Sequence, residues 1–183
     1  LHDQIGKGAD NYVPALLPGV SEEEAERLGD AHGRIYKDKY LRQAKPFPKA
    51  RDLLQRCKDT GYRVVLASSA SDSELEHYLK LLDAEDIVDA HTSADDVRSS
   101  KPCPDIFDTA RRQIGVAPDE ALVIGDTPYD IEAAAKAGMK AIAVRSGKFP
   151  DQSLSDALAI YDDVASILER FDATPLSRVE EQV

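Results

Sequence analysis

The stretch at residues 121–144, which reads ALVIGDTPYDIEAAAKAGMKAIAV, constrains the fold of this chain most. It begins with a short apolar run that suits a strand buried on both faces, and Gly125 ends that run. An alanine-rich segment follows and stops at Gly138, which is typical of a glycine just past the end of a helix. Residues 141–144 form a second apolar run. The stretch therefore predicts a strand, a helix and a parallel strand joined by a right-handed crossover.

From residue 46 onward the chain alternates between segments typical of strands and segments typical of helices. Short apolar runs predict strands at residues 63–67, 87–92, 121–124, 141–144 and 159–161. Capping residues and one-sided apolar patterns predict helices at residues 49–60, 71–82, 102–114, 130–138 and 164–171. Strands that alternate with helices of this length predict an α/β fold with a doubly wound parallel sheet.

Residues 1–45 lie outside this alternation and carry only helical signals. Ser21 and Glu24 form a capping box before an exposed, highly charged helix expected at residues 22–41. Two prolines within residues 45–48 predict a stiff connector after it. We therefore expect a helical lid at residues 1–45, an α/β core at 46–171 and an irregular tail at 172–183.

Composition narrows the possible partners. The net charge of −11 argues against a nucleic-acid or anionic membrane surface. No apolar run approaches the roughly 20 residues that a membrane span needs. The only cysteines, Cys57 and Cys103, do not form a C-x-x-C motif, so a reducing cytoplasm is the expected location.

Two carboxylates, Asp126 and Asp130, lie just beyond the carboxyl end of the strand at 121–124, where open α/β sheets bind their ligands. Mg²⁺ takes one or two protein carboxylates and keeps several waters, so this pair suits the ion beside a phosphate. The same spacing also allows a structural interpretation, in which Asp126 caps the helix and Asp130 is solvated. The motif alone leaves both interpretations open.

Polar residues follow two other predicted elements at the same edge of the sheet. Ser68 and Ser69 come directly after the strand at 63–67, where hydroxyls beside backbone N–H groups form an anion cradle or an ordinary turn. Lys101 precedes Pro102 and Pro104, which hold the chain extended. This lysine either delivers a positive charge to a phosphoryl group or is a solvated surface residue.

Taken in order, these parts resemble the haloacid dehalogenase-like hydrolase superfamily, which consists mostly of phosphatases. The stretches VVLASS, SSKPCPDIF and LVIGDTPYD look like its second, third and fourth motifs. Within the superfamily, the chain resembles phosphoglycolate phosphatase-like and β-phosphoglucomutase-like members. The resemblance implies a Rossmann-like core at residues 46–171, and it makes residues 1–45 a partial small α-helical cap.

The resemblance also implies roles for individual residues. Ser68 would bind the phosphate with Ser69, and Lys101 would supply the cation. Asp126 would ligate Mg²⁺, and Asp130 would be either a second ligand or an orienting carboxylate. Lys7, between two glycines in the cap, would contact the leaving group or remain a solvated loop lysine.

One part of the family pattern is missing. The family's nucleophile is the first aspartate of a D-x-D-x-T/V motif on the first strand, and no acidic cluster of this chain follows that pattern. The family order places the motif before the cap, so we expect it upstream of Leu1. In the family its strand lies between the strands that end at Ser68 and Asp126, and without it two buried edges are unpaired. Another chain or an N-terminal segment would then supply it, or the sheet would close differently.

The implied function is Mg²⁺-dependent hydrolysis of a small-molecule phosphate monoester through an aspartyl-phosphate on the upstream aspartate. This chain alone would then be inactive. A phosphomutase shares every motif and remains an alternative, and a non-catalytic binding or regulatory module is the alternative from another class.

Overall fold

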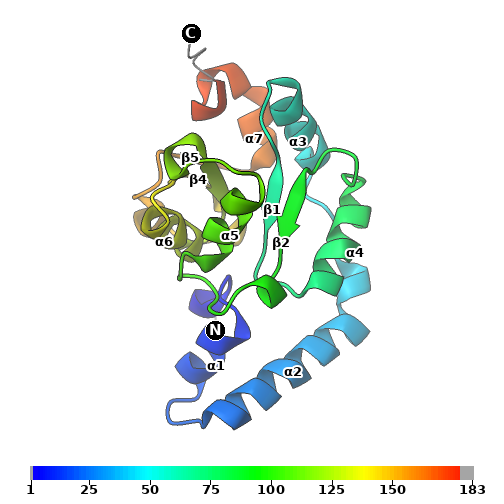
Figure 1. Ribbon diagram of the computed structural model, residues 1–183, viewed down its shortest axis with the longest axis vertical. Helices are drawn as coiled ribbons and strands as arrows, with labels where there is room; N and C mark the ends of the chain where they lie inside the picture. The colour runs from blue at the N-terminus through cyan, green and yellow to red at the C-terminus, as the bar shows by residue number, and fades with distance from the viewer. Residues whose placement is uncertain (1, 178–183) are drawn as a thin grey trace.

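The computed structural model describes residues 2–177 and shows two N-terminal helices, which we call the cap, beside an α/β core (Figure 1). In the cap, α1 (Ala9–Leu16) packs against α2 (Glu22–Lys39). The core elements are α3 (Ala50–Asp59), β1 (Val65–Ala67), α4 (Asp72–Leu82), β2 (Ala90–Thr92), α5 (Asp105–Gln113), β3 (Leu122–Gly125), α6 (Pro128–Lys136), β4 (Lys140–Val144), β5 (Ala159–Tyr161) and α7 (Val164–Glu169). Every strand pairing is parallel, which confirms the predicted α/β class.

Local capping explains where the helices begin. The Ser21 hydroxyl accepts a hydrogen bond from the backbone N–H of Glu24 at the start of α2 (3.2 Å). At the start of α4, the backbone N–H of Ser71 donates to the Glu74 carboxylate (2.8 Å). The first contact lies where the sequence predicts a capping box, and the second lies at the predicted start of the helix at residues 71–82.

The first two strands are shorter than predicted, because a side chain replaces part of their backbone pairing. The N–H of Val64 donates to the Asp89 carboxylate (2.8 Å), so β1 begins only at Val65. The segment before Asp89 forms a buried turn around Ile87, which is 2% exposed, and β2 begins only at Ala90. Apolar runs that are buried in turns and runs that are buried in strands look alike in a sequence.

The parallel sheet is divided into two parts. β1 pairs with β2, and β3, β4 and β5 pair in that order. Within residues 2–177, β1 and β3 each have one edge without a strand partner. Ile124 on β3 is 37% exposed, whereas β4 has four consecutive buried residues.

Both parts of the sheet lie between the same helical layers. On one face, Ile106 of α5 and Ile131 of α6 pack in a cluster that includes Val123 of β3 and Ala67 of β1. On the other face, Leu53 of α3 packs in a second cluster with residues of α7 and β4 and with Val64, which directly precedes β1. The arrangement is that of a doubly wound sheet, with β1 and β3 separated inside it.

The predicted irregular tail needs a correction within the described residues. Residues Phe171–Ala173 and Pro175–Ser177 form 3-10 turns, and Leu176 is 4% exposed. The Tyr62 hydroxyl donates to the carbonyl of Leu176 (3.1 Å), which attaches this segment to the core. Residues 178–183 of the predicted tail lie outside the described part of the chain.

None of the helices that the structure describes has the length and apolar character needed to cross a membrane.

Candidate active site

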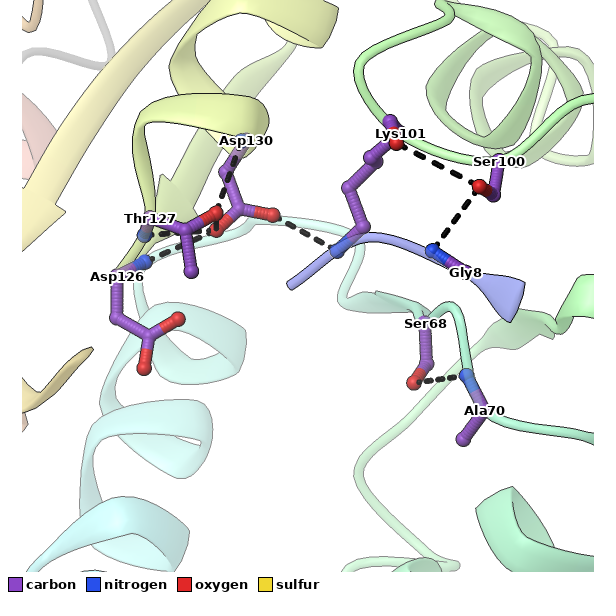
Figure 2. A network of polar contacts seen from close by, with 8 residues as sticks. All are labelled: Gly8, Ser68, Ala70, Ser100, Lys101, Asp126, Thr127 and Asp130. Atoms are coloured by element: carbon purple, nitrogen blue, oxygen red, sulfur yellow. Dashed lines mark hydrogen bonds and ion pairs between the residues drawn. The ribbon is translucent and has the colours of Figure 1, made fainter. Parts of the chain in front are cut away.

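Ser68, Lys101 and Asp126 come from three loops and are brought to one edge of the core. Ser68 follows β1, Asp126 follows β3, and Lys101 lies in the loop before α5, residues 99–104, which we call the lysine loop. In Figure 2, the side chains of Ser68 and Asp126 point toward the same side of the view, and the Lys101 ammonium lies between these two residues. The edge is the carboxyl end of parallel strands, where α/β proteins bind ligands.

Asp130 is built into the start of α6 rather than exposed to solvent. Its Oδ2 atom accepts hydrogen bonds from the backbone N–H groups of Asp126 (3.1 Å) and Thr127 (3.0 Å) and from the Thr127 hydroxyl (2.8 Å). The Thr127 hydroxyl in turn accepts from the backbone N–H of Asp130 (3.2 Å), so these two residues form the capping box of α6. The helix cap is therefore Thr127, and the interpretations of Asp126 as the cap and of Asp130 as solvated are both wrong.

Lys101 forms a buried ion pair with the other oxygen of that carboxylate. Its Nζ atom lies 2.7 Å from Asp130 Oδ1, and the two side chains are 11% and 7% exposed. The interpretation of Lys101 as a solvated surface lysine is therefore wrong. The pair is close to Gly125, where an added Cβ would lie 2.3 Å from the Asp130 Cβ, so this position accepts only glycine without rearrangement.

The Asp126 carboxylate differs from that of Asp130. Within residues 2–177, no other side chain forms a hydrogen bond or ion pair with it. Burial raises the pKa of Asp126 above its usual value, the charge of Asp130 raises it further, and Lys101 lowers it. Its backbone is tightly enclosed, since a Cβ on Gly147 would lie 2.1 Å from the Asp126 carbonyl oxygen.

The two serines after β1 also differ from each other. The Ser68 hydroxyl accepts a hydrogen bond from the backbone N–H of Ala70 (3.1 Å) and retains its own proton as a donor (Figure 2). The Ser69 hydroxyl is buried and has no hydrogen-bond partner in the described chain. A buried polar atom without a partner is costly, so this hydroxyl marks a place that a polar ligand could satisfy.

The cap reaches the site through the segment that contains Lys7. Lys7 donates to the side chain of Gln4 (2.9 Å), and its Nζ atom lies 4.6 Å from the centre of the Tyr129 ring. Lys7 therefore rests on the first turn of α6, next to the residues of the site rather than among them.

Several residues at this edge are absent from the sequence predictions. Ser100, Asp10 and Asn11 join the cap to the lysine loop by hydrogen bonds. No local motif marks these long-range contacts. Thr127, in contrast, could have been found, because a threonine followed three residues later by an acid before an apolar helix is a capping signal.

The metal prediction fits one carboxylate better than two. Among the residues that the structure describes, no group of three or more histidine, cysteine or acidic side chains converges as a metal site. Both oxygens of Asp130 already accept protein donors, whereas the oxygens of Asp126 do not. Because Mg²⁺ tolerates a single protein carboxylate when water and phosphate complete its shell, Asp126 fits the ion as its protein ligand.

This combination of fold and side chains defines an α/β protein with a candidate anion site at the carboxyl edge of a parallel sheet. The chain belongs to the haloacid dehalogenase-like hydrolase family, whose model matches residues 15–144. This finding confirms the resemblance stated from the sequence motifs.

Two curated relatives show how far the likeness extends. A haloacid dehalogenase-like hydrolase domain-containing protein of Arabidopsis thaliana is 32% identical over 125 residues, which are 67% of this chain and 40% of that protein. An (S)-2-haloacid dehalogenase of Burkholderia cepacia is 30% identical over 143 residues, 78% of this chain and 60% of that protein. The chain thus spans less than two thirds of either relative.

Solved structures extend the comparison to the fold. A hydrolase from Pseudomonas syringae has a TM-score of 0.85 and 29% identity, and the match covers 94% of this chain and 81% of that one. A β-phosphoglucomutase-like protein from Bacteroides vulgatus has a TM-score of 0.78 and 22% identity, with 96% and 73% covered, and shares the fold.

Proposed function

We propose that this chain forms part of a Mg²⁺-dependent hydrolase of small-molecule phosphate monoesters. The observation that supports this proposal is the contrast between the Asp130 carboxylate, whose two oxygens both accept protein donors, and the Asp126 carboxylate, which has no side-chain partner in the described residues. The Ser69 hydroxyl, after β1, is also without a partner there. With the Lys101 ammonium, these groups are a cation, a carboxylate and hydroxyl donors, which together suit a phosphate and its metal ion.

Each residue has a distinct task in this proposal. The Ser68 and Ser69 hydroxyls donate hydrogen bonds to phosphate oxygens. Lys101 uses one N–H on Asp130 and directs the others at the phosphate, because an ammonium has three donors. Asp130 orients the lysine, and Asp126 holds Mg²⁺, which supplies charge neutralisation when it is bound.

The cap completes the assignment on the leaving-group side. Lys7 lies on Tyr129 near the start of α6, from where a change of side-chain rotamer directs its ammonium at the part of the substrate beyond the phosphate. The close contact of this segment with the core would also limit access of water, and this observation favours a phosphomutase as the second candidate function.

The nucleophile is the part that this chain does not contribute. We propose that an aspartate on a further parallel strand attacks phosphorus and forms an aspartyl-phosphate, which water hydrolyses. That strand would pair with the unpaired edges of β1 and β3, between the two helical layers. An N-terminal segment or a second chain would supply it, and this chain alone would be inactive. The compartment we expect is the cytoplasm, since Cys57 and Cys103 are both free thiols.

The proposal is tested by ligand binding, which does not need the nucleophile. We expect the 183-residue chain to bind inorganic phosphate more tightly with Mg²⁺ than without it in isothermal titration calorimetry. Asp126→Asn should abolish the effect of Mg²⁺. Asp38→Asn, an exposed residue of α2 that changes the net charge equally, should preserve it. A phosphate affinity that changes neither with Mg²⁺ nor with Asp126→Asn would contradict the proposal.

A further inference from the structure

The start of α1 contacts the lysine loop mainly through Ser100. The backbone N–H of Ser100 donates to Asp10 Oδ2 (2.9 Å), and its hydroxyl accepts from the backbone N–H of Gly8 (3.0 Å). The Asn11 side-chain amide donates to the Ser100 hydroxyl (2.9 Å) and carbonyl (3.2 Å). Every polar group of this serine, which is 7% exposed, is thus bound by residues about 90 positions away in the chain.

Lys101 directly follows this serine, and its backbone is held as well. The carbonyl of Lys101 accepts a longer hydrogen bond from the Asn11 amide (3.4 Å). The lysine loop also has a long-range hydrogen bond outside the cap. The exposed Lys136 side chain donates to the carbonyl of Pro102 (3.1 Å). Because the Lys101 ammonium must meet Asp130 at 2.7 Å, the place of its backbone decides whether that ion pair forms.

The two glycines that flank Lys7 show that this contact is close. A Cβ on Gly8 would lie 2.5 Å from the Ser100 Cβ, and a Cβ on Gly6 would lie 2.7 Å from a methyl group of Thr127. Gly6 also has a φ of +98°, which L side chains rarely adopt. The cap segment therefore touches both the lysine loop and the capping box of α6, and the G-K-G sequence is explained by this close approach.

We propose that Asp10 and Asn11 are positioning residues for Lys101. They hold the Ser100–Lys101 backbone in place only while α1 lies on the core, so movement of the cap away from the core releases the lysine from the anion site (Figure 2 shows the Gly8 and Ser100 part of this contact). The role of Lys101 in binding an anion rests on the proposed function, whereas the coupling between α1 and the lysine loop does not.

The coupling is tested without phosphate in the full chain. Asn11→Asp keeps the shape of the side chain but places an oxygen against the carbonyls of Ser100 and Lys101. We expect amide hydrogen exchange in residues 99–104 to become about tenfold faster, while exchange in β4 is unchanged. The NMR signal of the Lys101 ammonium, protected from exchange by Asp130, should broaden or disappear.

Matched variants keep the test decisive. Asp10→Asn retains an oxygen that can accept from Ser100 and should behave nearly as the original chain, whereas Asp10→Ala should behave as Asn11→Asp. Asp38→Asn removes one negative charge from the cap, as Asp10→Ala does, and controls for that loss of charge. If Asn11→Asp and Asp10→Ala both leave the loop exchange and the Lys101 signal unchanged, the positioning role is wrong.

Phosphate affinity then separates the two proposals. If the original chain binds phosphate with Mg²⁺, Asn11→Asp should weaken that affinity about tenfold. Unchanged affinity despite faster loop exchange would also overturn the positioning role. If the original chain does not bind phosphate at all, the proposed function fails, and the exchange and ammonium signals still decide the coupling.

Discussion

The two halves of the candidate site are built in opposite ways. In the half formed by Lys101, Thr127 and Asp130, the carboxylate oxygens accept hydrogen bonds from four protein groups and the ion pair is buried. In the half formed by Asp126 and Ser69, the carboxylate and the hydroxyl have no protein side-chain partner within the described residues.

This difference separates what folding uses from what is left for a ligand. Groups that are already saturated stabilise the loops and gain nothing from a ligand. Partly buried polar groups without a hydrogen-bond partner reduce stability, and a ligand that supplies the missing hydrogen bonds recovers this free energy. Substitutions at Thr127 and Asp130 should therefore act on folding, and substitutions at Asp126 and Ser69 should act on binding. Lys101 contributes to both, because its ammonium uses one donor on Asp130 and has two further donors.

The largest expected effect is on the saturated half. Asp130→Ala leaves the Lys101 ammonium buried without its partner and removes the acceptor of the α6 capping box, so it should lower the free energy of unfolding by about 3–5 kcal/mol. Urea denaturation measures the change. Glu132→Ala, on the same helix and in an exposed pair with Lys136, should cost less than about 1 kcal/mol. An equal loss in the free energy of unfolding for the two variants would show that the buried Lys101–Asp130 pair stabilises the fold no more than an exposed pair does.

A smaller effect, of opposite sign, is expected for Asp126. Its pKa is raised in the folded chain, so between the unfolded value near 3.8 and the raised folded value the folded state binds more protons than the unfolded state. Stability contributed by this group is therefore lost as the pH rises through that interval. Asp126→Asn removes the penalty, and at pH 7 it should be more stable than the original chain.

The measurement for Asp126 is the free energy of unfolding of both chains at a series of pH values. The advantage of Asp126→Asn should grow as the pH rises from below 3.8 and then become constant. A variant that is less stable than the original chain at pH 7 would show that the Asp126 carboxylate contributes to folding.

The smallest change in stability is expected for Ser69→Ala, and Ser100→Ala, at another buried hydroxyl, provides the comparison. Ser69→Ala removes a hydroxyl that has no partner, so its free energy of unfolding should change by less than about 0.5 kcal/mol or increase slightly. Ser100→Ala removes a hydroxyl that accepts from Gly8 and Asn11 and should cost about 1–2 kcal/mol. Thermal and urea unfolding of the two variants measure both changes. A loss of stability for Ser69→Ala as large as that for Ser100→Ala would show that the Ser69 hydroxyl has a partner in the folded chain.

The elements that could be predicted are those whose signals are local. Examples are the apolar run before Gly125, the alanine-rich helix after it and the capping residues of α2 and α4. Each of these signals specifies the structure of residues only a few positions away. The α/β class and the placement of Ser68, Lys101 and Asp126 at one edge follow from them, because parallel strands share the direction of their carboxyl ends. The capping role of Thr127 has the same local origin and was missed only because Asp126 competes for it.

The remaining features depend on residues that are distant in the sequence. The Asp89 side chain shortens β1 by binding Val64, the ammonium of Lys101 finds Asp130 across 29 positions, and Gly8 meets Ser100 across 92. The sequence by itself determined which chemical groups arrive at the carboxyl edge, since strand, turn and helix signals are local. Only the tertiary structure decided which of those groups are saturated and which remain open, because pairing depends on how the cap and the two parts of the sheet pack together.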